Sequence, residues 1–466
     1  YKRQCQNNGP NRSVHSLTHQ ITDPRKPFIM TVHMGLPDPS KKDTGGGFRI
    51  GVKSDLNEHR SNCFAGGGIN AGIAGGELIL GRKKTKLMLP IGAKQYQLDL
   101  VGKPVGDKYE LTLRPTSLDV RSREVLPAIT ARVEAEDILG NIALVSNYAT
   151  ATKKAKRGTE EAAYRFQNWN AGGDAFTVTD ENRFGPILWS MYSLSDSRSE
   201  EGFVLKISAL TGPLGANDNQ SVEFNIRPEG RMWMEAGEAE LDSDAWVATL
   251  RIPNWDEKKS HPYRFIYRET LKDGSKAVHI WHGTIKANPS QGKVRLGALT
   301  CQNDYGFPYE PVANNLVKLD PDMLYFSGDQ LYEGHGGFGI IREPADPAIL
   351  NYLRKFYQFG WAFREAMRNA PTLCIPDDHD VFQGNIWGEG GAPMKGLEQG
   401  ASSKGGYRQP PKMVNVVHKT NCGHHPDLHD PTPVKQGISV YYGDMVYGGV
   451  SFAIIGDRQW KSGPDR

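Results

Sequence analysis

Residues 372–380 have the sequence TLCIPDDHD, an apolar run followed by three carboxylic acids and a histidine. The apolar part is typical of a short buried strand, which the proline would end. Residues 294–301 (VRLGALTC) and 323–329 (MLYFSGD) have the same form, and residues 348–369 have a helical pattern. Short strands that alternate with helical stretches predict an α/β sheet from about residue 291 onward.

Each of these predicted strands leads into side chains that bind metals in proteins. The first is followed by Cys301, the second by Asp329 and Tyr332, and the third by residues 377–380. Gly328 would let the chain turn sharply, so that the next aspartate projects from the strand end. Ligands of open α/β sheets bind beyond the carboxyl ends of the strands. We therefore expect these side chains to converge on one site.

The residue types at this edge favour cations over a purely structural role. The carboxylates around His379 would repel one another unless they were exposed or bound to cations, although a tight proline-initiated turn is an alternative. Taken singly, Asp329 is as typical of a turn as of a ligand, and Tyr332 is typical of a core. An aspartate that bridges two cations would hold them roughly 3.5 to 4 Å apart, the spacing that clamps a phosphoryl group.

The composition limits the classes of function. The 466 residues are enough for about two to four domains. A net charge of +3 predicts neither nucleic-acid nor membrane binding. No apolar run approaches the roughly 20 residues of a membrane span, and Tyr1 is not followed by a hydrophobic signal core. We expect an exported protein, periplasmic or extracellular, whose chain starts at a mature N-terminus.

The chain before residue 291 is rich in short strands. Residues 1–165 alternate in short runs broken by glycine, which predicts a jelly-roll (concanavalin-like) β-sandwich. A charged stretch at 152–162 favours a linker, and residues 166–290 predict an immunoglobulin-like β-sandwich. Residues 291–466 would form the N-terminal part of a third, α/β domain. The expected fold is multidomain, β-rich plus α/β, with a glycan as a candidate ligand of the first domain.

The cysteines are too few for a disulfide framework. There are five, so that at least one thiol is unpaired, and Cys301 is the candidate. We expect the others to be buried small hydrophobic residues or an occasional bridge: Cys5, Cys63, Cys374 and Cys422.

Three motifs in this order resemble the alkaline phosphatase D family of calcineurin-like metallophosphatases. They are GDQLYE at 328–333, DDHDV at 377–381 and DRQW at 457–460. The resemblance covers about residues 295–466, and the preceding sandwich, which ends with WHGTI at 281–285, also resembles the N-terminal domain of that family. It implies that the third domain is a calcineurin-like α/β sandwich, the metallophosphatase domain.

The resemblance implies a dinuclear metal centre. Cys301, Asp329 and Tyr332 would bind an iron-like ion, with Asp329 bridging to a second cation that Asp378 also binds. Thiolate and phenolate suit a trivalent or soft ion, and carboxylates suit calcium, magnesium or manganese. The expected pair is Fe³⁺ with Ca²⁺, and Mg²⁺, Mn²⁺ or Zn²⁺ are alternatives for the metal identity.

The resemblance also implies catalytic roles. His379 would face the substrate phosphate, and Asp380 would orient the imidazole. Asn303 and Asn385 are balanced between lining the substrate site and forming turns. Arg458 would contact the phosphate, or it would pin a strand end to the preceding aspartate.

A histidine-rich stretch, residues 421–429, is a second candidate site. Its prolines break regular structure, so that a loop insertion near the mouth of the active site and an additional metal site both remain open.

The expected function is hydrolysis of phosphate esters by metal-activated water, with monoesters and diesters both open. The alternative is an extracellular binding or assembly protein with a vestigial phosphatase fold, because residues 1–290 exceed what catalysis requires. The family also uses an Asp-Gln-His motif and a further histidine, which residues 461–466 do not supply. We therefore expect that the remaining C-terminal part of the same precursor docks beside this chain and completes the site.

Overall fold

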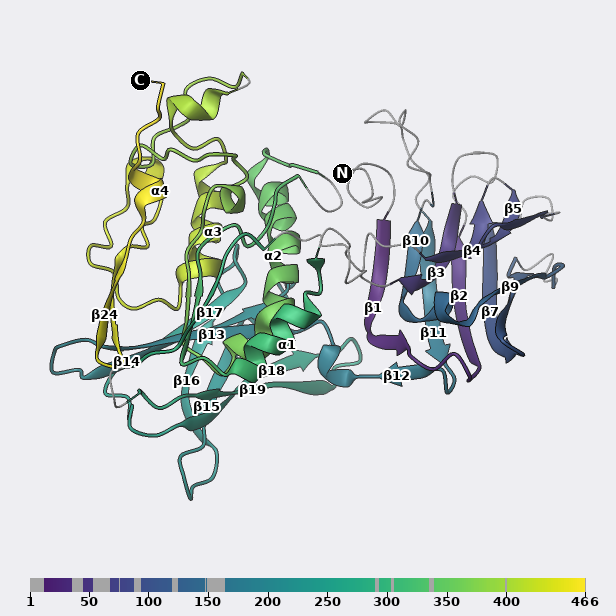
Figure 1. Cartoon of the computed structure of the whole chain (residues 1–466), viewed down its shortest axis with the longest axis horizontal. Helices are drawn as coiled ribbons and strands as arrows, with labels where there is room; N and C mark the ends of the chain where they lie inside the picture. The colour runs from purple at the N-terminus through teal and green to yellow at the C-terminus, as the bar shows by residue number, and fades with distance from the viewer. Residues whose placement is uncertain are drawn as a thin grey trace. The chain divides into compact units, whose positions relative to one another are not determined.

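The computed structural model divides the chain into two compact units (Figure 1). One unit holds residues 1–183 with 334–339, and the other holds residues 184–333 with 340–466. The structure describes residues 12–35, 45–52, 68–74, 76–87, 94–119, 125–146, 148, 164–289, 293–302, 306–334, 339–398 and 400–465. In these ranges, no helix is both long and apolar enough to cross a bilayer.

The first unit is a β-sandwich. In its described part, one sheet has the order β12-β1-β10-β3-β4-β5-β6 and the other the order β11-β2-β7-β8-β9. The strands alternate as predicted, so that Phe28, Met30 and Val32 of β2 point into a core shared with Phe48 of β3. The described strands are β1 (Arg12–Ile21), β2 (Phe28–Gly35), β3 (Gly45–Val52), β4 (Ile69–Ala74), β5 (Glu77–Leu80), β6 (Lys83–Lys86), β7 (Gln95–Val105), β8 (Lys108–Ser117), β9 (Ile129–Glu134), β10 (Gly140–Ser146), β11 (Arg165–Gly172) and β12 (Phe176–Val178).

The expected domain boundary at residue 165 is wrong. β11 pairs with β2, and β12 pairs with β1, so that the chain stays in the first sandwich until Arg183. Phe166 and Trp169 of β11 and Phe176 of β12 pack against its core. The charged stretch 152–162 lies outside the described residues, and it precedes strands that return to the same core instead of a new domain.

The second unit begins with another β-sandwich. Within the described residues, its sheets are β13-β14-β17 and β16-β15-β18-β19. A buried polar network joins them: Ser190 of β13 shares a 2.6 Å hydrogen bond with the hydroxyl of Tyr263 and accepts one of 2.8 Å from the indole of Trp281. The strands are β13 (Ile187–Asp196), β14 (Phe203–Thr211), β15 (Ser221–Ile226), β16 (Met234–Glu240), β17 (Val247–Ile252), β18 (His261–Thr270) and β19 (Lys276–Ile285).

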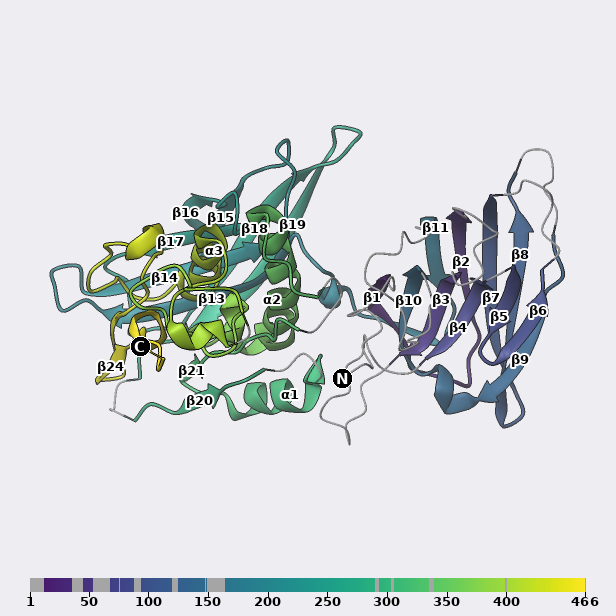
Figure 2. The same ribbon diagram turned by 90° about the horizontal axis from the view of Figure 1, so that it is seen from above.

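The α/β segment follows in the same unit. β20 (Leu296–Leu299), β21 (Met323–Phe326) and β22 (Thr372–Cys374) form a parallel sheet in that order. Two crossovers, through α1 (Glu310–Leu319) and α2 (Ala345–Met367), progress in one direction, so that the right-handed rule puts both helices on one face of the sheet. Phe326 of β21 packs on Phe359 and Phe363 of α2. Figure 2 shows β20 and α1 along one margin of the unit.

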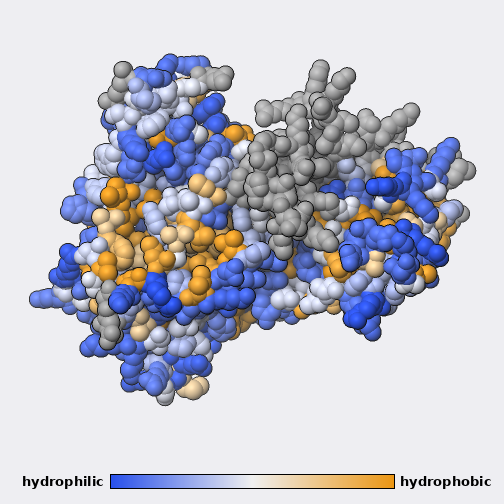
Figure 3. Space-filling model, in the orientation of Figure 1, coloured by the Kyte–Doolittle hydropathy of each residue, from blue (hydrophilic) through white to orange (hydrophobic). Residues whose placement is uncertain are grey.

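The described chain after β22 adds helix α3 (Pro411–Cys422), a hairpin of β23 (Gly443–Tyr447) and β24 (Val450–Ile454), and the short helix α4 (Asp457–Trp460). Figure 3 shows apolar side chains gathered on one face of this unit, between the regions of β24 and α1 in Figure 1. Leu296, Leu319 and Ile455 are among the exposed apolar residues of the unit.

Helix α2 joins the second sandwich to the α/β sheet. Trp189 of β13 contacts Phe356 and Tyr357 of α2, with ring centroids 5.6 and 5.9 Å apart. A Cβ atom at Gly360 would lie 2.3 Å from the Trp189 ring, so the helix can approach the strand only because this residue is glycine. The two segments form one compact unit, whereas we expected separate domains on either side of residue 291.

We expect Gly360→Ala to destabilise the protein by about 1–3 kcal/mol through overpacking, less up to about 1 kcal/mol gained in helix propensity. Thermal unfolding followed by circular dichroism should show a lower Tm. The control is Gly212→Ala, where the added methyl group would meet no atom within 4 Å. Equal Tm values for the two variants would contradict the close packing of α2 on β13.

Candidate metal centre

The predicted ligands lie at the carboxyl ends of the parallel strands, as the sequence predicts. Cys301 follows β20, Asp329 follows β21, and Asp378 follows β22. The backbone also joins two of these loops: the N–H of Cys301 donates to the carbonyl of Gly328 at 3.1 Å, and the N–H of Gln302 donates to the carbonyl of Asp329 at 2.7 Å. The first two ligands are therefore fixed relative to each other by main-chain bonds.

Left-handed backbone conformations direct the side chains toward the site. Gly328 has φ 114°, and a Cβ atom there would lie 2.4 Å from Cβ of Asp377, so glycine is required for the close approach of the two loops. Asp329 and Cys301 have φ values of 54° and 56°. Non-glycine residues in this region are strained and gather at functional sites. The sharp turn predicted at Gly328 is confirmed.

Five of the predicted residues meet here. Ligand atoms of Asp329, Asp378 and His379 all lie within 4.8 Å of one another. Sγ of Cys301 lies 3.8 Å from Oδ2 of Asp329. The phenol of Tyr332 hydrogen-bonds to Cys301 and Asp329, and its ring lies 4.4 Å from that of His379. This thiol, phenol, imidazole and carboxylate set can hold metal ions.

The charges fit a cation. Burial, together with the charges of Asp378 and Asp377 and against the opposing effect of His379, raises the pKa of Asp329 to about 6. Burial, followed by the charge of Asp378, also raises the pKa of Asp377. Crowded acids of this kind cost free energy unless a positive charge offsets them, and perturbed pKa values gather at functional sites. The cluster thus has the charge and the donors that a metal requires.

Asp380 does not have the role that we expected. Its side chain is fully buried and accepts backbone N–H groups from Asp329 at 2.8 Å, Gln330 at 2.9 Å and Asp377 at 2.8 Å. Burial raises the pKa of this carboxyl well above its usual range. The prediction that it orients the imidazole is wrong, because the side chain points into the interior and binds backbone N–H groups of the loops after β21 and β22.

Glu333 takes that position instead. Its Oε2 lies 2.5 Å from Nδ1 of His379, and its own carbonyl accepts a 2.6 Å bond from Nζ of Lys355. Burial alone would lower the pKa of His379, but Glu333, followed by Asp329 and Asp378, raises it to about 9. The only sequence signal for this residue was its position directly after Tyr332, and adjacency alone does not show that its carboxylate pairs with His379.

The predicted substrate residues are distributed differently. Asn303 lies outside the described residues. The backbone N–H of Asn385 donates to a carboxylate oxygen of Asp378, and Asn385 has φ 60°. Nε of Arg458 lies 2.8 Å from Oδ1 of Asp377, so its guanidinium pairs with that carboxylate and not with the adjacent aspartate. Asn385 and Arg458 therefore support the acidic loop, which is formed by residues 377–380. Their contact with substrate stays a prediction.

Two histidines of the histidine-rich stretch lie in the interior, whereas His429 is exposed. His424 and His425 are buried, and they follow the end of α3, where they lie against β22. Nε2 of His425 accepts a 2.9 Å bond from the N–H of Cys374, and Nε2 of His424 bonds to the carbonyl of Thr372 at 2.9 Å. Burial lowers the pKa of His424 to about 3, so the ring is neutral. For these two histidines both alternatives left open by the sequence are wrong, because their rings satisfy backbone groups of β22.

The other cysteines agree with their expected structural role where they are described. Cys374 and Cys422 are buried free thiols, and Sγ of Cys422 lies 3.2 Å from the carbonyl oxygen of Cys374. Cys5 and Cys63 lie outside the described residues.

Neither a family model nor a curated protein matched the chain. Among solved structures, a β-glucuronidase of Parabacteroides merdae aligns with 70% of this chain and 48% of its own, at 8% identity and a TM-score of 0.23. The chain thus spans about half the length of that protein. A likeness at this level carries no argument about fold or chemistry.

We expect Glu333→Gln to lower the pKa of His379 in metal-free protein. The pKa of His379 is raised in the folded state, so its pair with Glu333 stabilises the fold fully below about pH 6.5, and this stability is lost as the pH rises toward 9. Thermal unfolding should therefore show a larger loss of Tm for the variant at pH 6 than at pH 9.5.

The matched control is Glu269→Gln, which breaks another pair, with His279, at 2.7 Å on β18 and β19. Histidine NMR of the same samples should show an unchanged His379 titration in this control. A His379 titration that is also unchanged in Glu333→Gln would contradict the assigned pair.

Proposed function

We propose that this chain is a metal-dependent phosphoesterase of the alkaline phosphatase and phosphodiesterase type. The observation that carries the proposal is the convergence of Cys301, Asp329, Tyr332, Asp378 and His379 at the ends of three parallel strands. In this proposal, the two sandwiches are jelly-roll-like and immunoglobulin-like, and the α/β segment is calcineurin-like. The metal identity proposed is Fe³⁺ with Ca²⁺.

The donors divide into two sets around Asp329. The thiol of Cys301 lies 3.8 Å from Oδ2 of Asp329, the phenol of Tyr332 hydrogen-bonds to both residues, and this thiol and phenol suit a trivalent or soft ion. The carboxylate of Asp378 lies within 4.8 Å of that of Asp329 and would suit an oxygen-preferring ion, and the imidazole of His379 lies beside the pair. When bound, such a pair of cations supplies Lewis-acid activation of water and neutralises charge on the phosphoryl oxygens.

His379 is the group placed to act on the substrate. Glu333 holds Nδ1, which leaves Nε2 as the ring nitrogen for a phosphate oxygen or for the leaving group. In the metal-free protein and against the effect of burial, Glu333 raises the pKa of His379 to about 9, which favours a protonated ring that would donate to the leaving group as the ester bond breaks. Glu333 would keep the ring oriented and charged during this transfer.

Contacts within the chain hold the loop of residues 377–380 in place. Asp380 binds the backbone of both loops, and Arg458 neutralises Asp377. Preorganised groups of this kind lose little entropy when a substrate binds. This rigidity favours catalysis over a passive structural role.

Metal analysis of the purified chain, combined with assays on p-nitrophenyl phosphate and bis-p-nitrophenyl phosphate, tests the proposal. We expect bound metal and turnover of at least one of the esters. Tight metal without turnover of either would favour the binding or assembly protein instead.

We expect Asp329→Asn to lose metal and His379→Ala to keep it, with turnover at least about a hundredfold lower in both. Asp329 is shared by both donor sets, whereas His379 acts mainly on the substrate. Metal analysis of each variant distinguishes the two roles. The control is Asp444→Asn, in which an exposed aspartate of β23 is changed. If His379→Ala lost metal as completely as Asp329→Asn, this division of roles would be wrong.

We also expect Cys301 to be alkylated slowly in metal-loaded protein and faster after chelation, because a coordinated thiolate is protected. Cys301 is exposed, whereas Cys374 and Cys422 are buried and serve as internal controls. Mass spectrometry of the labelled peptides measures each rate. Equal rates for Cys301 before and after chelation would argue against its role as a ligand.

A further inference from the structure

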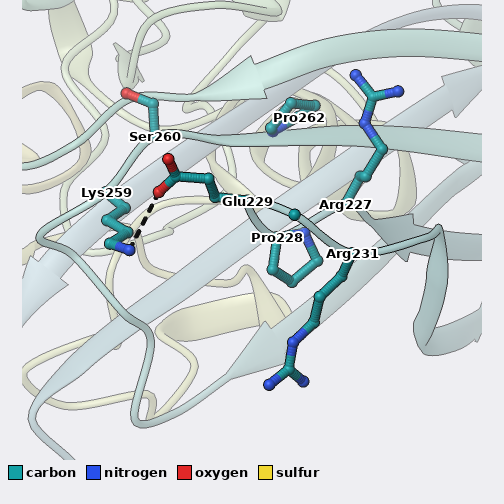
Figure 4. A pocket seen from close by; sticks show the side chains of 8 residues that line it. Arg227, Pro228, Glu229, Arg231, Lys259, Ser260 and Pro262 are labelled. Atoms are coloured by element: carbon teal, nitrogen blue, oxygen red, sulfur yellow. Dashed lines mark hydrogen bonds and ion pairs between the residues drawn. The ribbon is translucent and has the colours of Figure 1, made fainter.

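An open pocket of about 610 Å³ lies in the sandwich of the second unit, apart from the residues of the metal centre (Figure 4). It is formed where the β15–β16 connection meets the start of β18. Its lining residues are Arg227, Pro228, Glu229, Gly230, Arg231, Lys259, Ser260 and Pro262. Basic side chains outnumber acidic ones in this lining.

The charges of the pocket are not balanced. Glu229, the acidic residue of the lining, pairs with Lys259 at 3.2 Å, as Figure 4 shows. Arg227 and Arg231 have no carboxylate partner in the part of the chain that the structure describes. Several exposed arginines elsewhere in this unit have carboxylate partners: Arg251 pairs with Glu201 and Asp427, Arg268 with Glu223, and Arg198 with Asp444. The two guanidinium groups of the pocket are therefore available to an anion.

Aromatic stacking fixes one of these groups. The guanidinium of Arg227 lies 5.2 Å from the ring centre of Trp233, and that of Arg264 lies 4.7 Å from it. Arg264 in turn donates to Oδ1 of Asn225 at 3.0 and 3.1 Å. A stacked guanidinium loses less conformational entropy when it binds a ligand than a free one does.

The walls of the pocket are also fixed by main-chain bonds. The N–H of Arg227 donates to the carbonyl of Pro262 at 2.9 Å, and the N–H of Arg231 donates to the carbonyl of Pro228 at 3.0 Å. Figure 4 shows the two guanidinium groups pointing to opposite sides. A ligand that contacts both groups would therefore need two separated anionic groups.

We propose that this pocket binds a ligand that carries at least two tetrahedral oxyanion groups, phosphate or sulfate, one at each of Arg227 and Arg231. The planar donors of arginine match the oxygens of such groups. A volume of about 610 Å³ is large enough for a small organic ligand with two such groups. The site does not depend on the metal centre or on its chemistry.

Titration calorimetry of the full chain tests the proposal, with tripolyphosphate and a trisulfated disaccharide as separate probes. The Asp329→Asn background keeps the probes from competing for a metal-loaded centre. We expect Arg227→Gln/Arg231→Gln to weaken binding by at least about tenfold, since charged hydrogen bonds are lost. Lys272→Gln/Lys276→Gln, which removes the same charge from the exposed β18–β19 turn, should weaken it by less than about twofold.

The quenching of Trp233 fluorescence by each probe gives a second readout, which Trp233→Phe assigns. Binding of only the phosphate probe, or of only the sulfate probe, would support the site and identify its ligand class. Equal losses in the two double variants would show non-specific charge attraction and overturn the proposal. Absence of binding by both probes would also overturn it.

Discussion

A buried carboxylate holds together the two loops that carry Asp329 and Asp378. Asp380 accepts backbone N–H groups from the loop after β21 and from the loop after β22, at distances of 2.8 to 2.9 Å. Each of these donors would otherwise be buried without a partner, at a cost of about 1–3 kcal/mol. Asp329 and Asp378 hold their positions because the main chain beneath them is fixed in this way. The geometry of the whole cluster thus depends on a residue that does not face it.

The electrostatics of the cluster follow from the same compactness. Bringing Asp329, Asp377 and Asp378 into one partly buried space raises the pKa values of the first two. The positive charges that the chain itself supplies stand at the edges, as the imidazole of His379 against Glu333 and the guanidinium of Arg458 against Asp377. The centre between them is left acidic, which is the condition that a cation would relieve.

Much of this arrangement could be predicted from short apolar runs and the polar residues that follow them. The three parallel strands, their ligands and the turn at Gly328 were accessible, because strand ends of one sheet meet at one edge. The direction of the Asp380 side chain and the pairing of Glu333 with His379 could not be predicted, because spacing in the sequence does not determine how a side chain points from a loop. The burial of His424 and His425 and the return of β11 to the first sandwich both depend on distant partners. Local pattern carries no information about such contacts.

The layer behind the strand ends limits how such a site can change. Cys374 of β22 is bonded to Cys422 of α3 and to His425 just after it, while Asn421 of α3 accepts a 3.2 Å bond from Gln330, the residue after Asp329. A substitution in this layer would leave a buried group without its partner, so purifying selection should act on it as strongly as on the ligands themselves. Residues at the mouth of the site that have no buried hydrogen-bond partner would lack this constraint. Divergence among descendants of this protein would therefore accumulate at the mouth of the site and alter which molecules enter, while the chemistry at the strand ends stayed constant.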